Sequence, residues 1–281
     1  MSKSYEKDKL GSRMKTYEAV PKNYLTLGTP KVIRLDMRAG HTFCKKFNRP
    51  FDDVFSECMI YATKELCEKV SGVVMGYTQS DEISLVINDS VKKDGTDCFF
   101  NGNVEKMASI SASICTLAFN KKYCEMVDAM EDSNQKAVYE ERLWTAQFDS
   151  RVFCLPNVME VHNYILWRQQ DATKNSVRQV GYANFSHKTL DGKNTSDVQD
   201  MLMLQKGINW NNFPVKYKRG CVVIKELYKK DVVLPNGELI KDVQRRRWIE
   251  FEIPILTQDL EFVPKLYAKQ LLVDGVLQEV E

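Results

Sequence analysis

Long apolar runs are missing from this 281-residue sequence, and none approaches the roughly 20 residues that a membrane-spanning helix needs. Glycine is scarce at 13 residues, which excludes a collagen-like chain. A strong excess of one charge is also missing, because 40 lysine and arginine residues face 38 aspartate and glutamate residues. With 43% hydrophobic residues, the chain is expected to fold as one large domain or two small ones.

Clustered cysteines are missing as well, since the eight cysteines are scattered and no C-x-x-C pair occurs. Only His41, His162 and His187 could assist them, so the spacing argues against a zinc site. The first residues alternate in charge and contain no apolar signal-peptide core. We therefore expect a soluble, cytoplasmic protein with reduced thiols and no membrane partner.

Hydrophobic periodicity predicts alternating strands and helices in the first two thirds of the chain. Asn103 is a good candidate to cap the second of the helices. In chain order we expect a strand at 31–35, a helix at 53–70, a hairpin of 73–77 and 83–87, a helix at 104–123, a strand at 151–155 and a helix after Asn157.

This order predicts an α+β fold of the ferredoxin-like type, an antiparallel sheet with helices on one face, which is also the architecture of polymerase palms. The pattern changes near residue 190. A short helix at 196–205, a strand at 221–227 and a strand at 248–253 follow. We expect a palm-type catalytic domain at 1–190 and a C-terminal extension at 191–281, β-rich and helical, packed on the palm.

Two acidic positions stand out in this arrangement. Asp36 follows an apolar strand, and Asp81 lies at the tip of the hairpin expected beside it. Carboxylates that converge in this way repel each other, and hard divalent cations such as Mg²⁺ relieve the repulsion. On pattern alone, ordinary roles at a strand end and in a turn explain both residues as well.

Several segments resemble the tRNA-histidine guanylyltransferase family and its wider set of guanylyltransferase-like proteins. They occur in order over roughly residues 10 to 225. The matching segments are LGSRMKTYE (10–18), VIRLDMRAGHTF (32–43), GYTQSDEISLVI (76–87), FDSRVF (148–153), NYILWRQQDATKNS (163–176) and KGINWNNFPVKYKRG (206–220).

The resemblance implies nucleotide addition to the 5′ end of tRNA in the 3′-to-5′ direction. It implies two Mg²⁺ ions, activation of a 5′-monophosphate by a nucleoside triphosphate (GTP or ATP), and attack by the 3′-hydroxyl of the incoming nucleotide. It also implies a homotetramer. These expectations agree with the acidic pair, because phosphoryl transfer depends mostly on positioning and charge neutralisation.

The resemblance assigns metal-binding and catalytic roles to two carboxylates. The family motif reads approximately Asp-Gly-Arg-x-Phe-His-x-Phe, and residues 36–43 match it here. Asp36 matches the ligand shared by both metals, and Asp81 the second carboxylate. Met37 replaces the glycine whose backbone carbonyl binds a metal, so the backbone must accommodate a side chain that disfavours positive φ.

Other residues match positions that contact the nucleotide, and Lys106, on the helix expected at 104–123, is a further cationic candidate that a solvated surface lysine explains as well. Amides around residues 37–41 would hold the triphosphate. For His41, a packed histidine bonded to the backbone explains the sequence as well as a nucleotide contact does. Glu82 should point to the opposite side of the strand from Asp81, so it is expected to orient a neighbouring residue. The expected nucleotide-binding residues are Arg38, Ala39, Gly40, His41, Arg49, Ser80, Glu82 and Lys106.

The predicted tRNA-binding residues are mostly basic, although an ordinary solvated face explains such a pattern equally well. The eukaryotic guanylyltransferases carry HINNLYN where residues 173–179 lie here, and only Asn175 of the paired asparagines is retained. This loss favours templated repair of 5′-truncated tRNA over guanylate addition to tRNA-His. The expected tRNA contacts are Arg168, Lys174, Asn175, Arg178, Lys216, Lys218 and Arg219.

Two other functions remain open at this point. A nucleotide cyclase palm shares the acidic plan, although residues 79–83 lack the Gly-Gly-Asp-Glu-Phe-like hairpin of such cyclases. A non-catalytic tRNA-binding protein is the third possibility. The run Arg245-Arg246-Arg247 is a further candidate for RNA contact, and in a strand at most two of the three could serve one surface.

Overall fold

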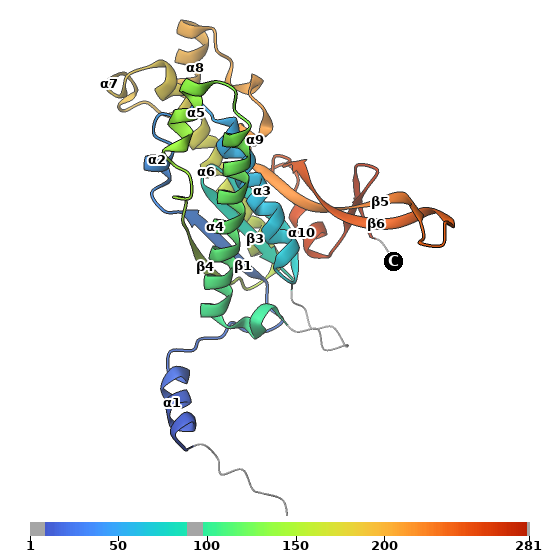
Figure 1. Cartoon of the computed structure of the whole chain (residues 1–281). Coiled ribbons are helices and arrows are strands. Elements are labelled where there is room, and N and C mark those ends of the chain that lie inside the picture. The colour runs from blue at the N-terminus through green and yellow to red at the C-terminus, as the bar shows by residue number, and fades with distance from the viewer. Residues whose placement is uncertain (1–8, 89–97, 280–281) are drawn as a thin grey trace, which may run out of the picture.

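The computed structural model describes residues 9–88 and 98–279. Its central sheet contains β4 (Phe148–Cys154), β1 (Lys31–Met37), β3 (Glu82–Ile87) and β2 (Val73–Gln79) in that spatial order, all antiparallel. With the helices between them, this is the ferredoxin-like order (Figure 1). The predicted fold is confirmed.

Two helices cover one face of the sheet, as the sequence predicted. They are α3 (Asp53–Lys69) and α4 (Val104–Asp128). The side chains of Asp52 and Asn103 accept backbone N–H groups of the first turns and so cap them. Alternate residues of β1 and β3 point toward these helices into an apolar core, which joins the sheet to both helices.

The second face of β2 and β3 is also covered, which the sequence analysis did not anticipate. There α6 (Val158–Asn184) and α10 (Phe262–Tyr267) pack over Met75, Tyr77 and Val86. Every residue of β2 is buried, so both faces of this strand need an apolar partner. No described helix has the length and apolar character needed to cross a membrane.

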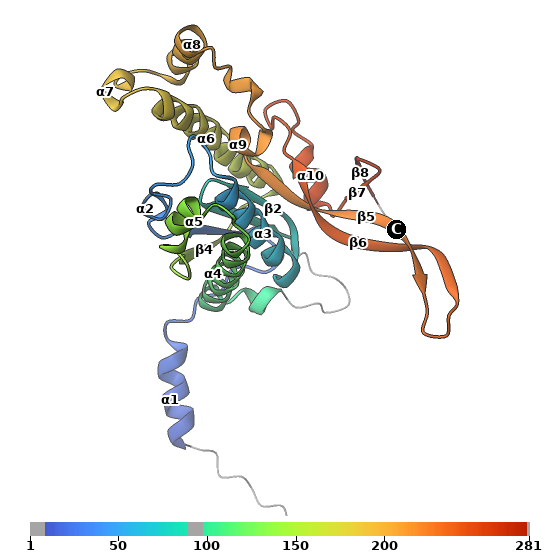
Figure 2. The same ribbon diagram turned by 45° about the horizontal axis from the view of Figure 1, so that its top comes forward.

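The C-terminal part continues the same sheet. β5 (Cys221–Val233) pairs with β2, and β6 (Leu239–Glu252) pairs with β5 beyond the edge of the palm. Together these two strands form a long arm that projects from the body (Figure 2). The short strands β7 (Leu271–Val273) and β8 (Val276–Gln278) lie beside its base.

Several elements were missed or predicted too short. Both hairpin strands run further than expected, leaving only Ser80 and Asp81 in the turn. α8 (Thr195–Lys206) agrees closely with its prediction. Besides α10, the unpredicted helices are α1 (Lys9–Ala19), α2 (Gly40–Phe43), η1 (Phe99–Gly102), α5 (Ser133–Glu140), α7 (His187–Leu190), η2 (Trp210–Asn212) and α9 (Val215–Arg219).

Candidate active site

The strand register brings the two predicted catalytic carboxylates to the same end of the sheet. Asp36 on β1 lies opposite Glu82 on β3, so the preceding Asp81 occupies the turn next to it. The backbone N–H of Met37 donates to the carbonyl of Asp81 at 3.0 Å. Burial, followed by the negative charge of Asp81, raises the pKa of Asp36. The two carboxylates therefore interact electrostatically, as the sequence required of a metal-binding pair.

The carboxylate of Asp81 packs directly against the backbone of Gly40. A Cβ at this position would lie 2.1 Å from Asp81 Oδ2, closer than any real contact. Gly40 begins α2 and has ordinary helical geometry, so glycine is needed here for space rather than for unusual φ. A side chain at residue 40 would have to displace the carboxylate.

The backbone strain expected at Met37 lies elsewhere. Met37 ends β1 and is buried in the core. The left-handed conformation falls on Ala39, with φ of 55°, directly before α2. Ser80, in the opposite turn, has φ of 49°. Ala39 and Ser80 thus both adopt the left-handed conformation beside the acidic pair. In this conformation the Cβ lies close to the residue's own backbone, which costs conformational energy.

A cavity of about 540 Å³ adjoins Asp81. Its walls come from α2, the start of α3, the hairpin turn, α6 and α9, and they include the stacked rings of Phe51 and Tyr217, whose centroids are 4.6 Å apart. Eight of the predicted site residues line it, namely Gly40, His41, Arg49, Ser80, Asp81, Asn175, Arg178 and Lys216. His41 is exposed here, which does not match the alternative of a packed histidine.

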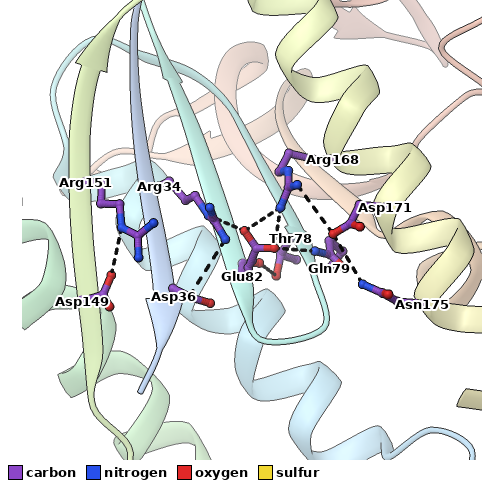
Figure 3. A network of polar contacts seen from close by, with 10 residues as sticks. All are labelled: Arg34, Asp36, Thr78, Gln79, Glu82, Asp149, Arg151, Arg168, Asp171 and Asn175. Carbon is purple, nitrogen blue, oxygen red and sulfur yellow. Dashed lines mark hydrogen bonds and ion pairs between the residues drawn. The ribbon is translucent and has the colours of Figure 1, made fainter. Parts of the chain in front are cut away.

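Glu82 is held by two arginines (Figure 3). Arg168 on α6 donates to both its carboxylate oxygens, at 2.8 and 3.2 Å, and Arg34 on β1 forms an ion pair with it from the other side. Burial raises the pKa of Glu82, and the charges of Arg168 and Arg34 oppose that rise. Glu82 therefore orients neighbours in this structure, and its carboxylate is not available to a nucleotide.

Arg168 is the clearest correction to the predicted tRNA-binding set. Only 5% of the residue is exposed, and its guanidinium is occupied by Glu82, by Asp171 at 3.6 Å and by the ring of Trp167 at 3.6 Å from the centroid. A buried, paired guanidinium stabilises the site but cannot present charge to an RNA phosphate. Lys174, on the same helix, is exposed.

Lys106 also lies apart from the cavity. The hydroxyl of Thr116 on α4 accepts the amide of Phe148, which pairs with Met37 at the active end of the sheet. Lys106 is ten positions earlier on α4, which places it ~15 Å along the helix at 1.5 Å per residue. This placement removes the reason to expect a contact between Lys106 and a nucleotide at Asp81.

The remaining predicted residues are divided between cavity, core and surface. Lys218 is buried beside Trp210 and donates to the carbonyl of Asn211 at 2.5 Å. Lys216 forms an ion pair with Glu57 at 2.8 Å. The other placements are Arg38, exposed and bound to Gln147, Arg178, donating to the carbonyl of Lys193, and Arg219, half-buried with its carbonyl bound by Tyr77.

Sequence reasoning missed two charged neighbours of Asp36. Asp149 on β4 stands directly opposite Asp36, and Arg151 stands opposite Arg34. The charge of Asp149 also raises the pKa of Asp36. The signal was present in the FDSRVF segment, because alternate residues of a strand share a face, but the register needed to place it came only with the structure.

The residues present suit a hard cation that shares its coordination with a substrate. Among residues 9–88 and 98–279, no three histidine, cysteine or acidic side chains gather as a closed metal cage. Asp36 and Asp81 supply two carboxylates whose repulsion is only partly offset by Arg34, 4.0 Å from Asp36, and by Arg151. Mg²⁺ is usually bound by one or two carboxylates together with substrate phosphates, so this pair fits the requirement.

The fold and the site define a class. A ferredoxin-like palm that carries paired carboxylates at one sheet end, beside a cavity large enough for a nucleotide, is the arrangement of a palm-type nucleotidyltransferase. Residues 11–156 match the family model of tRNAHis guanylyltransferase (Thg1). The chain belongs to this family, whose activity is nucleotide addition to tRNA in the 3′-to-5′ direction.

Relatives agree with this placement. An uncharacterised protein of Acanthamoeba polyphaga mimivirus is 31% identical over 244 residues, covering 80% of each chain. A probable tRNA(His) guanylyltransferase of Dictyostelium discoideum is 26% identical, covering 81% of this chain and 86% of the other.

Solved structures show the same relationship. A bacterial tRNA(His) guanylyltransferase (Thg1)-like protein in complex with ATP is 38% identical, with a TM-score of 0.77, covering 92% of this chain and 98% of that one. The tRNA(His) guanylyltransferase of Saccharomyces cerevisiae, at 20% identity, covers 81% of this chain and 94% of that one. Its TM-score of 0.61 shows the shared fold.

Proposed function

We propose that this enzyme repairs tRNAs that lack 5′ nucleotides, restoring them by Watson–Crick pairing against the acceptor strand. The main support is the juxtaposition of Asp36 and Asp81 at one end of the sheet beside the cavity. The retention of only Asn175 from the paired asparagines, and the 38% identity to a guanylyltransferase-like protein, support templated repair over guanylate addition to tRNA-His.

The proposed chemistry has two steps. The 5′-monophosphate of the tRNA first attacks the α-phosphate of ATP or GTP, which forms a 5′–5′ phosphoanhydride and releases pyrophosphate. The 3′-hydroxyl of the incoming nucleotide then attacks the tRNA phosphate, loses its proton and releases the activating nucleoside monophosphate. Asp36, Asp81 and the carbonyl of Met37 would hold two Mg²⁺ ions, which neutralise charge that develops on the phosphoryl oxygens. Gly40 leaves room for Asp81, and Arg34 and Arg168 restrain Glu82 beside it.

The nucleotide is proposed to lie in the cavity. Gly40, His41 and Ser80 line the cavity together with Asp81, and Arg49 in the same lining contributes positive charge. The amide of Arg38 is not available to the nucleotide, because it donates to the carbonyl of Gln147 at 2.8 Å. Support for the binding of triphosphates comes from similar bacterial proteins solved in complex with ATP and with GTP.

For the tRNA, the candidate contacts are now those with a reachable charge or amide. Lys174 and Asn175 are exposed on α6, and Arg178 and Lys216 line the cavity. Lys216 would have to exchange Glu57 for a phosphate. Lys218, bound to the carbonyl of Asn211, and Arg219 would support these contacts from neighbouring positions on α9 without binding RNA themselves. Arg168 is buried and would stabilise α6 against the catalytic turn.

The deciding experiment is incubation with a tRNA that lacks its first 5′ nucleotide, in the presence of triphosphates and Mg²⁺. We expect extension by the one complementary nucleotide, with addition that follows the template when the opposing base is changed. Guanylate addition to full-length tRNA-His, independent of the opposing base, would instead identify the alternative function. Absence of extension on every truncated tRNA would contradict both.

Two variants test the carboxylate assignment. Asp36→Ala and Asp81→Ala should lower single-turnover extension at least a hundredfold while largely sparing tRNA affinity, because each would remove a metal ligand. Asp200→Ala, which removes the same charge from an exposed position on α8, is the matched control. Turnover near the unmodified rate in either site variant would refute the metal assignment.

We further propose that the enzyme acts in the cytoplasm as a homotetramer. The tRNA substrate supports the compartment. Exposed apolar side chains on α1 and at the end of the arm support assembly, because a free chain would otherwise expose Leu10, Tyr17, Val233 and Leu239 to water.

A further inference from the structure

A second cavity lies at the base of the arm. It encloses about 280 Å³ between the C-terminal end of α3 and the paired strands β5 and β6. The N-terminal end of α3 lines the first cavity, so one helix separates the two. The residues that matter here are Lys225 on β5 and Arg246 and Trp248 on β6.

The strand register decides which basic residues of the arm face this cavity. Lys225 pairs with Trp248, and Leu227 pairs with Arg246, so these four share one face. Arg245 and Arg247 point to the opposite face. Arg247 is already engaged there by Glu226 at 2.6 Å and stacks on the ring of Tyr228. Arg246 and Arg247 both line the cavity. Because the side chain of Arg247 is held by Glu226 on the opposite face, Arg246 is the one of the three arginines whose side chain the register directs toward α3.

The charges in this cavity do not balance. Lys225 is half-buried, 4.8 Å from the ring centroid of Trp248, and its pKa is lowered by burial and by the positive charge of Arg246. Glu68 is the one carboxylate among the described residues that line the cavity. Glu68 and the end of α3 compensate one cation. Arg246 is exposed and has no ion-pair partner among the described side chains.

We propose that this cavity binds a backbone phosphate of the tRNA, as a contact separate from the catalytic cavity. The inference rests on the proposed function for the identity of the RNA. The two cations Lys225 and Arg246, offset by the single carboxylate of Glu68, leave a positive charge that is complementary to a phosphate. Arg246 can bind such a phosphate in a bidentate manner. Lys225 lies four residues along β5 from Cys221, which lines the catalytic cavity, a distance of ~13 Å at 3.3 Å per residue.

An RNA is favoured over a free phosphate because two cations that are partly or fully exposed to water bind a small ion only weakly. Each phosphate of an RNA that is neutralised releases condensed counterions, and this gain is absent for inorganic phosphate. The arm of β5 and β6 projects from the body beside the palm (Figure 2). A tRNA whose 5′ end reaches Asp36 can therefore lay its acceptor stem along this arm.

The test measures tRNA affinity over a range of salt concentrations with Arg246→Gln and Lys225→Gln. Each variant should reduce the slope of log K against log salt by about one and weaken binding. At saturating tRNA, kcat for extension should stay unchanged while KM rises. Arg245→Gln removes the same charge one residue away on the opposite face, so it should change neither quantity.

Other outcomes would overturn the proposal. An unchanged salt slope in Arg246→Gln would show that Arg246 does not contact a phosphate. An equal loss of tRNA affinity in Arg245→Gln would show that the binding does not depend on the face of the arm that lines the cavity. If inorganic phosphate raises the melting temperature of the unmodified protein but not of Arg246→Gln, and tRNA affinity is unchanged in that variant, the ligand of this cavity is a small anion and not RNA. Because affinity is also measured in the inactive Asp81→Ala chain, failure of the catalytic proposal leaves this test intact. Arg246 is exposed, so its variant should fold.

Discussion

His162 is the buried residue with the most unusual environment outside the site. It lies on α6, 1% exposed, close to the backbone of Leu256. Burial lowers its pKa, and the charges of Asp259 and Glu261 only partly oppose this. The folded protein therefore keeps the ring neutral at a pH where the unfolded chain already binds a proton.

The sign of the resulting pH dependence follows from linkage. Between the ordinary histidine pKa of about 6.5 and the lowered folded value, the unfolded chain binds more protons, so the free energy of unfolding falls as the pH falls. The slope for this one group is at most about 1.4 kcal/mol per pH unit. We expect His162→Phe to flatten the acid side of the stability curve, measured by urea unfolding from pH 7.5 to 5.

His187 provides the control for that measurement. It is exposed and rests on the ring of Tyr182. His187→Phe should leave the slope of the acid side unchanged. Equal slopes in the wild type and in His162→Phe would show that His162 does not contribute to acid sensitivity.

Individual site residues were predictable where local rules apply. The positions of Asp36 at a strand end and Asp81 at a hairpin tip follow from the pattern, and Asn103 from its capping position, but the metal-binding role of the two carboxylates came from the family resemblance. The role of Gly40 was expected from phosphate-binding turns, but its contact with Asp81 depends on where α2 folds back. Arg34 was not predicted, because its pairing with Glu82 needs the register of two strands that are 50 residues apart.

At the level of elements, one ion pair joins α6 to the hairpin that carries Asp81. Arg168 and Glu82 belong to elements that are far apart in sequence, and both are almost fully buried. Removal of Arg168 leaves Glu82 with Arg34 alone, and removal of Glu82 leaves Arg168 with Asp171, so the cost is at most about 3–5 kcal/mol, the value for a fully uncompensated buried charge. The pair therefore fixes how the helix that lines the cavity sits against the catalytic turn.

A double-mutant cycle tests this connection. Arg168→Met and Glu82→Gln should each lower the free energy of unfolding by about 3 kcal/mol, and the double variant by clearly less than the sum. Lys64→Met is the control, because its ion pair with Glu250 lies at the surface and is worth at most ~1 kcal/mol. Additive losses at Arg168 and Glu82, measured by urea unfolding, would contradict a coupled pair.

The elements themselves were foreseen where the hydrophobic pattern is regular. The spacing of apolar residues was enough for α3, α8 and the hairpin. It was not enough for α10, which has six residues and is defined by what it covers. The complete burial of β2 explains why this cover exists, but a continuous apolar run in sequence does not reveal whether one face or two are covered.

On the scale of the whole molecule, two parts extend from the compact body. α1 stands away from the sheet and buries none of its residues, and the arm of β5 and β6 extends in another direction (Figure 1). The exposed side chains of Leu10, Met14 and Tyr17 recur at helical spacing on α1, forming one apolar stripe. An isolated helix of this length is marginal in water, so it needs a partner surface.

Light scattering tests the expected assembly directly. We expect a particle of four times the 32.5 kDa chain. Replacing Leu10, Met14 and Tyr17 together by serine should reduce the mass of this particle, because the apolar stripe is lost. Substituting Lys9 and Lys15 by glutamine is the control for a change in α1 outside the stripe. A monomer of the unmodified chain at micromolar concentration would refute the tetramer.

Six charged side chains follow one another across the end of the sheet (Figure 3): Arg151, Asp149, Arg34, Asp36, Glu82 and Arg168, with the two acidic neighbours Asp36 and Glu82 side by side. Three are basic and three are acidic, and Asp81 in the adjoining turn adds a further negative charge. Loss of Arg34, Glu82 or Arg168 would leave a largely buried opposite charge with fewer partners, whereas Asp149 and Arg151 are more than half exposed and their pairing contributes little. In descendants of this gene Arg34, Glu82 and Arg168 should therefore be replaced as a set or stay as they are, which gives the evolutionary record a way to show that they act together.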